Sequence, residues 1–217
     1  MNGIEKAKII SKILNQIYPK IKVPLKSRNN FTLLISVLLS AQCTDVNVNN
    51  VTKNIYPRYN KPKHFVKLGR KRIEKLIKKI GIFRIKAKSI FNLSKILLEK
   101  HKGQVPKTFN ELEKLPGVGH KTASVVMSQG FGYPAFAIDT HIHRLAQRWG
   151  LTNGKNVTQT EKDLKNLFPK KNWNKLHLQI IYYGREYCKA RSCYGLTCKI
   201  CTTCYPHRKK PVITRKA

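Results

Sequence analysis

Acidic residues are scarce in this chain of 217 residues. Asp and Glu together number 10 against 44 Lys and Arg, which gives a formal net charge of +34 at pH 7. A surplus of this size predicts a polyanionic partner, because a basic surface releases counterions from nucleic acid when it binds. The chain is also rich in Lys, Asn and Ile, as the products of AT-rich genes are. The charge therefore favours nucleic-acid binding but does not locate the site.

Long apolar runs are missing as well. No stretch approaches the ~20 apolar residues that span a bilayer, and the N-terminus MNGIEKAKIISKIL lacks the apolar core and cleavage site of a secretion signal. We therefore expect a cytoplasmic protein, associated with the nucleoid through DNA binding, with no membrane partner. A hydrophobic content of 41% is ordinary for a globular chain and argues against disorder.

Strand patterns are also absent, and apolar residues recur at helical spacing along nearly the whole chain. Prolines and glycines separate the expected helices, and Gly69 divides two short ones. Helices are expected over 4–17, 30–41, 46–56, 63–68, 70–79, 84–101, 109–115, 122–129, 139–149, 158–168 and 176–190. The cysteine-rich segment that follows is expected to be a loop, and the predicted fold class is all-α.

The segment Leu115–Arg148, LPGVGHKTASVVMSQGFGYPAFAIDTHIHRLAQR, contains a glycine turn between two expected helices. Glycines in such a turn let backbone N–H groups approach a phosphate closely. The second helix adds its own N-terminal N–H groups and the positive end of its dipole. Gly117 and Gly119 are therefore predicted to bind DNA phosphate, and an ordinary helix corner is the alternative.

Lys121 and Asp139 are the candidate catalytic residues. Lys121 follows the turn at a helix N-terminus. A lysine amine is a usable nucleophile that forms Schiff bases with sugar C1′ carbons of aldehyde character. Asp139 is expected to cap a helix, and a carboxylate near C1′ stabilises the positive charge that develops as a base leaves. A lysine that only neutralises phosphate and an aspartate that only caps are the alternatives.

LPGVGHKTA followed by IDTHIHR resembles the endonuclease III family of helix-hairpin-helix DNA glycosylases, and the likeness extends from LLISVLLSAQCTD through IGIFRIKAKSI to the cysteines. The resemblance implies a two-lobed all-α fold and a monomer. It implies a six-helix domain with the hairpin over 23–133, a cluster domain made of 1–22 and 134–206, and a basic tail over 207–217.

The resemblance also implies an activity. The family's enzymes are bifunctional: they excise oxidised pyrimidines from double-stranded DNA and cleave the resulting abasic site by β-elimination, in base excision repair. Lys121 is implied as the nucleophile that forms the Schiff base, and Asp139 as the residue that assists it. Adenine-specific relatives lack the lysine and have a catalytic glutamate in the apolar helix near residue 38, where this chain has no acid. Lyase chemistry is therefore favoured.

Further residues are implied to contact DNA. Extruding a nucleotide costs a few kcal/mol, and Gln42 and Ile82 match family positions that enter the base stack, Gln42 toward the orphaned base and Ile82 as an apolar wedge. His120, where the family often has arginine, and His141 are expected near phosphates. Asp45 is expected to line the damaged-base pocket. The alternatives are that Ile82 belongs to the core and that Gln42 caps a helix.

Five of the six cysteines follow the pattern Cys188-x4-Cys193-x4-Cys198-x2-Cys201-x2-Cys204. In a reducing compartment this clustering predicts a metal or iron–sulfur site, not disulfides. The resemblance implies a structural [4Fe–4S] cluster, although the family's spacing is C-x6-C-x2-C-x5-C. The preferred ligands are Cys188, Cys198, Cys201 and Cys204. Replacement of one of them by Cys193, a four-thiolate zinc site and a site without metal remain alternatives.

Two other functions remain open at this point. A non-catalytic protein could bind DNA with the hairpin and the charge alone, and a cluster protein could act through its redox state. The lesion spectrum depends on pocket shape and does not follow from the sequence.

Overall fold

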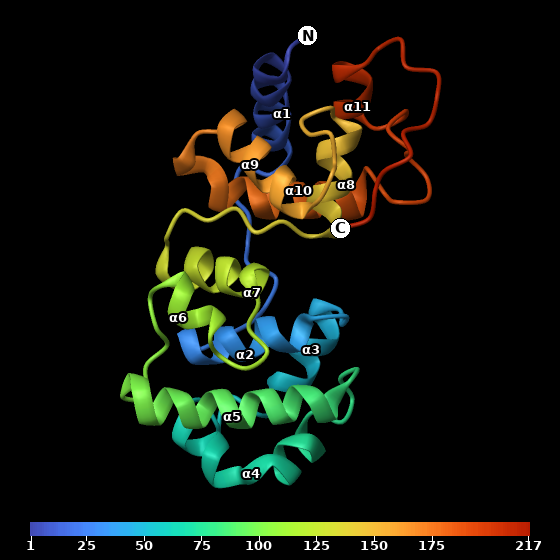
Figure 1. Ribbon diagram of the computed structural model, residues 1–217. Coiled ribbons are helices and arrows are strands. Elements are labelled where there is room, and N and C mark those ends of the chain that lie inside the picture. Colours follow the sequence, from blue (N-terminus) through green and yellow to red (C-terminus); the bar gives the residue numbers. More distant parts are fainter. The chain divides into compact units, whose positions relative to one another are not determined.

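Helices make up all the regular structure of the computed structural model, which describes residues 1–217 (Figure 1). In chain order they are α1 (Gly3–Ile17), α2 (Asn30–Ser40), α3 (Asp45–Thr52), α4 (Pro62–Leu76), α5 (Phe83–His101), α6 (Phe109–Glu113), α7 (His120–Val125), the π-helix η1 (Val126–Gly130), α8 (Thr140–Arg148), α9 (Val157–Leu167), the 3-10 helix η2 (Lys170–Asn172), α10 (Trp173–Glu186) and α11 (Lys199–Cys204). The all-α prediction is confirmed. None of these helices is both long and apolar enough to cross a membrane.

The chain divides into two compact units. The middle unit is Val23–Tyr133, and the terminal unit combines Met1–Lys22 with Pro134–Ala217. Each unit has its own set of packed helices. The hairpin turn belongs to the middle unit and the clustered cysteines belong to the terminal unit.

The core of the middle unit forms around α2, whose residues 31–39 are all buried. A helix that is apolar on every side has no face to offer to water, so it is stable only when other helices surround it. Helices α3, α5 and α7 and η1 all contact α2, and α5 also packs along α4. Asn29 caps the start of α2 by accepting a hydrogen bond from the N–H of Thr32 at 2.9 Å. The expected central helix is confirmed.

The core of the terminal unit brings together helices from both ends of the chain. Figure 1 shows α1 beside α9 and α10, and all three contribute to one apolar cluster. Leu14 of α1, Trp149 after α8, Leu164 of α9 and Tyr183 of α10 are fully buried in it. This packing fixes the ends of α8 and α10, and these two ends frame the cysteines.

The cysteine segment differs from the expected loop. Residues 199–204 form α11, in which Ile200, Cys201 and Cys204 are buried, and the N–H of Ile200 donates to Tyr183 Oη at 3.1 Å. Helix α10 ends at Glu186, four residues before the expected boundary. Just past this end, the N–H of Cys188 donates to the carbonyl of Tyr183 at 3.0 Å, five positions back. Side chains of α8 then bind the carbonyls of residues 188–190.

Candidate active site

The hairpin turn joins α6 to α7 within the middle unit. Thr108 caps α6 as expected, accepting from the N–H of Glu111 at 3.3 Å. Gly117 has a φ of 80°, and a Cβ at this position would come within 2.9 Å of Ser89 Cβ and 3.1 Å of Leu38 Cδ1. The glycine is therefore required both by the backbone conformation and by the close approach of the turn to α5 and α2.

Gly119 leaves the start of α7 uncovered, as expected of a glycine that lets backbone N–H groups approach a phosphate. As N-cap residue it is extended and offers no side chain, so no side chain caps the first N–H groups of α7. A Cβ at Gly119 would meet nothing within 4 Å. The turn is therefore exposed backbone with N–H groups at a helix start, the arrangement that suits a phosphate oxygen.

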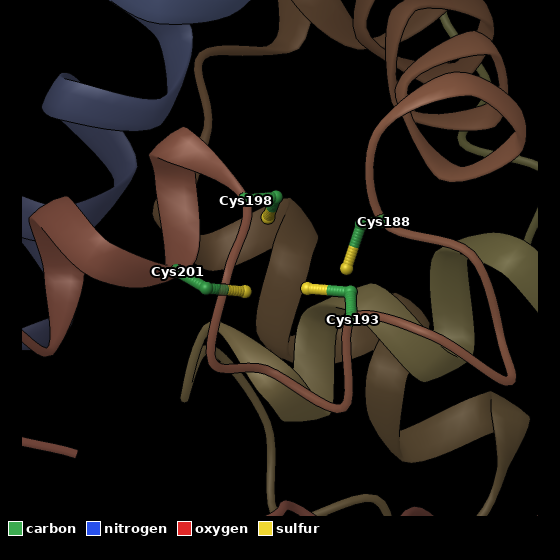
Figure 2. A group of neighbouring side chains, drawn as sticks. All are labelled: Cys188, Cys193, Cys198 and Cys201. Carbon is green, nitrogen blue, oxygen red and sulfur yellow. The ribbon is translucent and has the colours of Figure 1, made fainter. Parts of the chain in front are cut away.

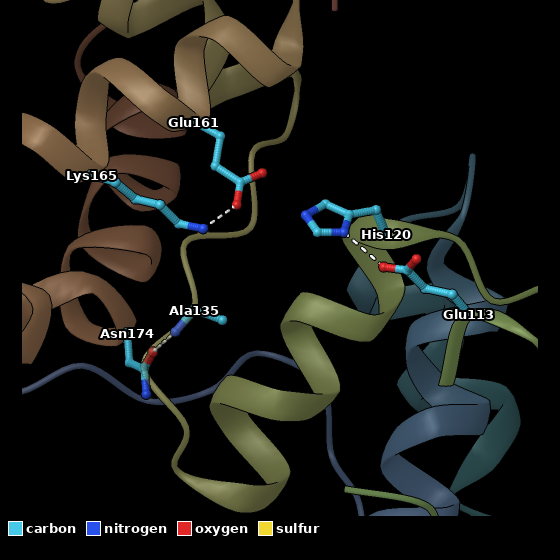
Figure 3. Close-up of polar contacts among 6 residues, drawn as sticks. All are labelled: Glu113, His120, Ala135, Glu161, Lys165 and Asn174. Atoms are coloured by element: carbon cyan, nitrogen blue, oxygen red, sulfur yellow. Dashed lines mark hydrogen bonds and ion pairs between the residues drawn. The ribbon is translucent and has the colours of Figure 1, made fainter. Parts of the chain in front are cut away.

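His120 and Lys121 are the first two residues of α7, and both are exposed. The His120 ring stacks on Phe109 with centroids 5.6 Å apart, and its Nδ1 lies 2.7 Å from Glu113 Oε1 (Figure 3). Both partners come from α6, so the imidazole joins the two helices of the hairpin. Lys121, in contrast, extends from an exposed position beside this fixed ring.

Asp139 lies in the terminal unit and is the N-cap of α8. Its Oδ1 accepts a hydrogen bond from the N–H of Ile142 at 2.8 Å, which confirms the expected cap. The preceding residues 135–138 are buried, and Asn174 Oδ1 accepts from the N–H of Ala135 at 3.0 Å (Figure 3). The carboxylate is thus half-buried at the end of an anchored segment, with one oxygen engaged by the backbone.

His141, the second residue of α8, packs against α10. A Cβ at Gly184 would lie 3.2 Å from His141 Nδ1, so α10 approaches the ring closely where it has a glycine. The same Nδ1 is 3.3 Å from Arg144 Nη2. Burial lowers the pKa of Arg144. The expected contact of His141 with a phosphate stays a prediction.

Gln42 and Ile82 share an unusual conformation. Their φ values are 53° and 49°, in the left-handed region that favours glycine. For a β-branched residue such as Ile82 this is a clear outlier, and left-handed backbone costs about 1–2 kcal/mol per residue. Both side chains are exposed, Ile82 to 51%. The alternative in which Ile82 belongs to the core is wrong. Exposed residues held in strained conformations are typical of functional sites.

Four cysteines converge in the terminal unit. The Sγ atoms of Cys188, Cys193, Cys198 and Cys201 all lie within 4.8 Å of one another, and all four residues are buried (Figure 2). Cys204 is also buried, but it is not part of this group. The geometry thus differs from the preferred ligand set and agrees with the alternative in which Cys193 replaces one ligand. Cys204 is displaced because it sits one turn further along α11 than Cys201.

The four thiols suit a metal centre on their own chemistry. None of them is in a disulfide. Hydrogen bonds with Cys188 and Cys201 lower the pKa of Cys198, which favours a thiolate there, whereas hydrogen bonds with Cys188 and Cys198 raise the pKa of Cys201. Arg148 is only 2% exposed, and its Nη1 lies 3.4 Å from Cys188 Sγ. A buried cation requires a nearby anion, and thiolates that hold a metal cluster provide one.

Lys86 on α5 and Arg148 on α8 are buried basic residues that were not predicted from the sequence. The signal was present in the helical spacing. Lys86 falls in register with Ala87, Ile90 and Leu93 on the buried face of α5. A basic side chain on the apolar face of an amphipathic helix is unusual, and it marks a residue with hydrogen-bond acceptors inside the protein.

Residues 35–170 match the model of one protein family, HhH-GPD, which is described as "HhH-GPD superfamily base excision DNA repair protein". Among curated relatives, the chain is 40% identical over 198 residues to endonuclease III of Bacillus subtilis (strain 168), covering 91% of this chain and 90% of that one. It is 42% identical over 191 residues to endonuclease III of Escherichia coli (strain K12), covering 88% and 90%.

Solved structures of DNA glycosylases are also similar to this chain. A trapped endonuclease III–DNA covalent intermediate, in an estranged-adenine complex, matches with a TM-score of 0.87 and 39% identity, covering 92% of this chain and 94% of that one. A thermostable thymine-DNA glycosylase matches with a TM-score of 0.81 at 21% identity, covering 90% and 94%, which shows a shared fold alone.

Proposed function

Because the chain belongs to the HhH-GPD superfamily of base excision DNA repair proteins and is a DNA glycosylase with abasic-site lyase activity, we propose that it excises oxidised pyrimidines through a Schiff base on Lys121. Its partner is double-stranded DNA. The observation that carries the proposal is the exposed Lys121 at the start of α7, directly after a glycine turn with uncovered N–H groups.

The DNA strand is bound through its backbone at the hairpin. The N–H groups near Gly117 and Gly119 take a phosphate, which positions the strand without reading its sequence. His120, fixed by Phe109 and Glu113, contributes a ring nitrogen beside this phosphate. The net charge of +34 adds the nonspecific attraction that brings duplex DNA to the protein.

The chemistry begins when the Lys121 amine attacks C1′ of the damaged nucleotide. The new C–N bond forms as the bond to the base breaks, and the base leaves with a proton. The Asp139 carboxylate stabilises the positive charge that develops at the sugar. The sugar ring then opens as the C1′–O4′ bond breaks and O4′ takes up a proton, which gives a protonated Schiff base on Lys121. Loss of a proton from C2′ then expels the 3′ phosphate, which is the β-elimination.

Gln42 and Ile82 keep the duplex open while the nucleotide is extruded. Their strained backbones hold both side chains outward from the middle unit. Ile82 enters the stack as an apolar wedge, and the Gln42 amide meets the base left without a partner. Asp45, in the first turn of α3, lines the pocket for the damaged base.

For the cysteine group we propose a [4Fe–4S] cluster held by Cys188, Cys193, Cys198 and Cys201, the set that converges in space. When bound, the cluster would supply a rigid crosslink, not redox chemistry at the lesion. The chain's own contribution is to tie the end of α10 to α11 and to leave Lys189, Arg191 and Lys199 exposed for phosphates. The middle unit then serves as the hairpin domain and the terminal unit as the cluster domain.

Borohydride trapping tests the catalytic proposal. Wild-type protein is incubated with duplexes that contain thymine glycol, an abasic site or no lesion, and the Schiff base is reduced to a stable adduct. We expect adducts with both lesions, none with Lys121→Ala, and wild-type yield with Lys95→Ala, which removes an exposed lysine of α5. Asp139→Asn keeps a residue able to cap α8 and should slow base excision without lowering stability.

The outcomes separate the two classes of function. If wild-type protein binds the abasic duplex but never forms an adduct, the catalytic proposal is wrong and the protein only binds DNA. If the adduct persists in Lys121→Ala, another amine is the nucleophile.

A further inference from the structure

Lys86 is a buried lysine that the mechanism above does not use. It is 4% exposed and lies on α5. Its Nζ donates hydrogen bonds to the carbonyl oxygens of Leu39 at 2.9 Å and Ala41 at 2.6 Å. The last carbonyls of a helix have no partner within the helix, so Lys86 satisfies two acceptors at the C-terminal end of α2. Its positive charge also lies at the negative end of that helix dipole.

These bonds act directly on Gln42. The carbonyl of Ala41 belongs to the peptide unit that continues into the nitrogen of Gln42, so the amine of Lys86 fixes the orientation of that peptide plane. Gln42 follows with a φ of 53°. A residue other than glycine keeps a left-handed conformation only where its surroundings hold it there. The hydrogen bonds of Lys86 hold the backbone of this turn from inside the protein.

The same residue also reaches Ile82. The backbone N–H of Lys86 donates to the carbonyl oxygen of Ile82 at 3.2 Å, which is the first helical bond of α5. Ile82 is the N-cap of α5 and has a φ of 49°. This backbone bond needs no lysine side chain, but it places Lys86 next to Ile82 while its amine binds the Gln42 turn.

A second side chain joins the two turns near this point. Asn47 Nδ2 donates to the carbonyl of Lys79 at 3.1 Å and to Cys43 Sγ at 3.2 Å. A Cβ at Gly81 would lie 3.8 Å from the carbonyl oxygen of Gln42. The turn after α2 and the turn before α5 are thus in contact. Burial lowers the pKa of Lys86, and nearby Cys43 opposes this, so placing the charge here has a cost that the two carbonyls offset.

We propose that Lys86 is a positioning residue whose amine holds Gln42, beside Ile82, in the exposed geometry needed to fill the gap left by an extruded nucleotide. Lys86 touches no DNA itself, because it is buried beneath the two turns. This inference rests on the proposed role of Gln42 and Ile82. Substitution of a positioning residue differs measurably from loss of a phosphate contact. It should weaken binding to the lesion and leave nonspecific binding to DNA intact.

A double-mutant cycle tests the proposal. The variants are Lys86→Met, Gln42→Ala and the double variant, with Lys95→Met as a control that removes an exposed lysine from the same helix. Binding is measured to a duplex with a stable tetrahydrofuran abasic analogue opposite 2-aminopurine, and to the same duplex without the lesion. The fluorescence of 2-aminopurine reports whether the orphaned base is contacted.

We expect Lys86→Met and Gln42→Ala each to weaken binding to the abasic analogue about tenfold, and the double variant to be no more than about twofold weaker than Gln42→Ala, because the two changes disable one device. Both single variants should alter the 2-aminopurine signal alike. Lys86→Met and Lys95→Met should bind the intact duplex equally well and with the same salt dependence. Removal of a phosphate-binding lysine would instead weaken binding to every duplex and change the salt slope.

Additive losses in the double variant, near a hundredfold, would overturn the proposal, as would wild-type lesion binding by folded Lys86→Met. A lower melting temperature with unchanged lesion binding would show that Lys86 only stabilises the fold. If Lys86→Met does not fold, Lys86→Gln, which keeps one donor group, takes its place in the cycle. Failure of the wild type to prefer the abasic duplex would contradict the proposed function itself and not this inference alone.

Discussion

Lys86 in the middle unit and Arg148 in the terminal unit solve the same local problem in different ways. Each is a buried basic residue that binds backbone carbonyls beside the end of a helix. Lys86 binds two carbonyls at the end of α2, and the residue that follows them, Gln42, extends into solvent. Arg148 binds the carbonyls of Lys189 and Ala190 at 2.8 Å after α10, beside a group of buried thiols.

The difference follows from the two side chains. The lysine amine is a compact point charge that fits at one helix end, whereas the planar guanidinium can bind several acceptors at fixed angles. Arg148 reaches the carbonyls of three successive residues and a sulfur atom. One amine that binds two neighbouring carbonyls suits a short turn that presents one side chain. A set of fixed donors suits a loop that brings four buried cysteines together.

The largest effect should come from loss of the metal proposed for the cysteine group beside Arg148. Cys193→Ser should lose the metal, because Cys193 lies within the converging group, whereas Cys204→Ser should retain it, because Cys204 lies outside. Metal per chain and the visible spectrum, measured after anaerobic purification, check this. Retention by Cys193→Ser together with loss in Cys204→Ser would restore the ligand set favoured by sequence spacing. A colourless protein containing zinc would replace the iron–sulfur proposal.

Arg148→Met should be the most destabilising change outside the cysteines. It leaves several acceptors and a thiolate group without their buried donor, and breaking a buried charged contact costs about 3–5 kcal/mol. Urea unfolding of the metal-loaded protein measures the loss, and Arg191→Met, at an exposed arginine of the same loop, is the control. Arg148→Lys should recover only part of the stability, since an amine lacks the fork. Equal unfolding midpoints for Arg148→Met and Arg191→Met would contradict the comparison.

A smaller effect of opposite sign is expected in the middle unit. Ile82→Gly should raise the free energy of unfolding by about 0.5–1 kcal/mol, because relief of the left-handed strain exceeds the entropy lost by glycine. It should also weaken binding to abasic DNA, since the wedge is gone. Ile85→Gly, at an exposed isoleucine with helical backbone, should destabilise instead. Thermal melts and binding to the abasic duplex test both, and a destabilised Ile82→Gly would remove the argument that strain is held there.

The sequence predicted those features that depend on local patterns. The apolar run of α2, the Thr108 cap, the Asp139 cap and the break at Gly69 each follow from residues close in the chain, and the structure has all four. Gly69 indeed interrupts α4 with a φ of 70°.

Features that depend on contacts across the chain were not predicted. Arg148 meets carbonyls some forty positions away, and Lys86 meets Ala41 across 45 positions, so neither partner is visible locally. Likewise, Cys193 and not Cys204 converges with the other three cysteines, and the carbonyls that follow α10 bind side chains of α8. Cysteine spacing along the chain does not reveal which sulfur atoms converge, since Cys204 is buried on α11 without joining the group.

The split composition of the terminal unit has a consequence for how the chain folds during synthesis. Helix α1 is made first, but its partners come last: Gln179 Nε2 donates to the carbonyl of Leu14 at 3.3 Å across 165 positions. The middle unit, Val23–Tyr133, is complete while α8 and α10 are still unmade. Since domains fold as they leave the ribosome, we expect the hairpin unit to form early and α1 to wait, with its apolar face uncovered, until the cysteine segment has been synthesised.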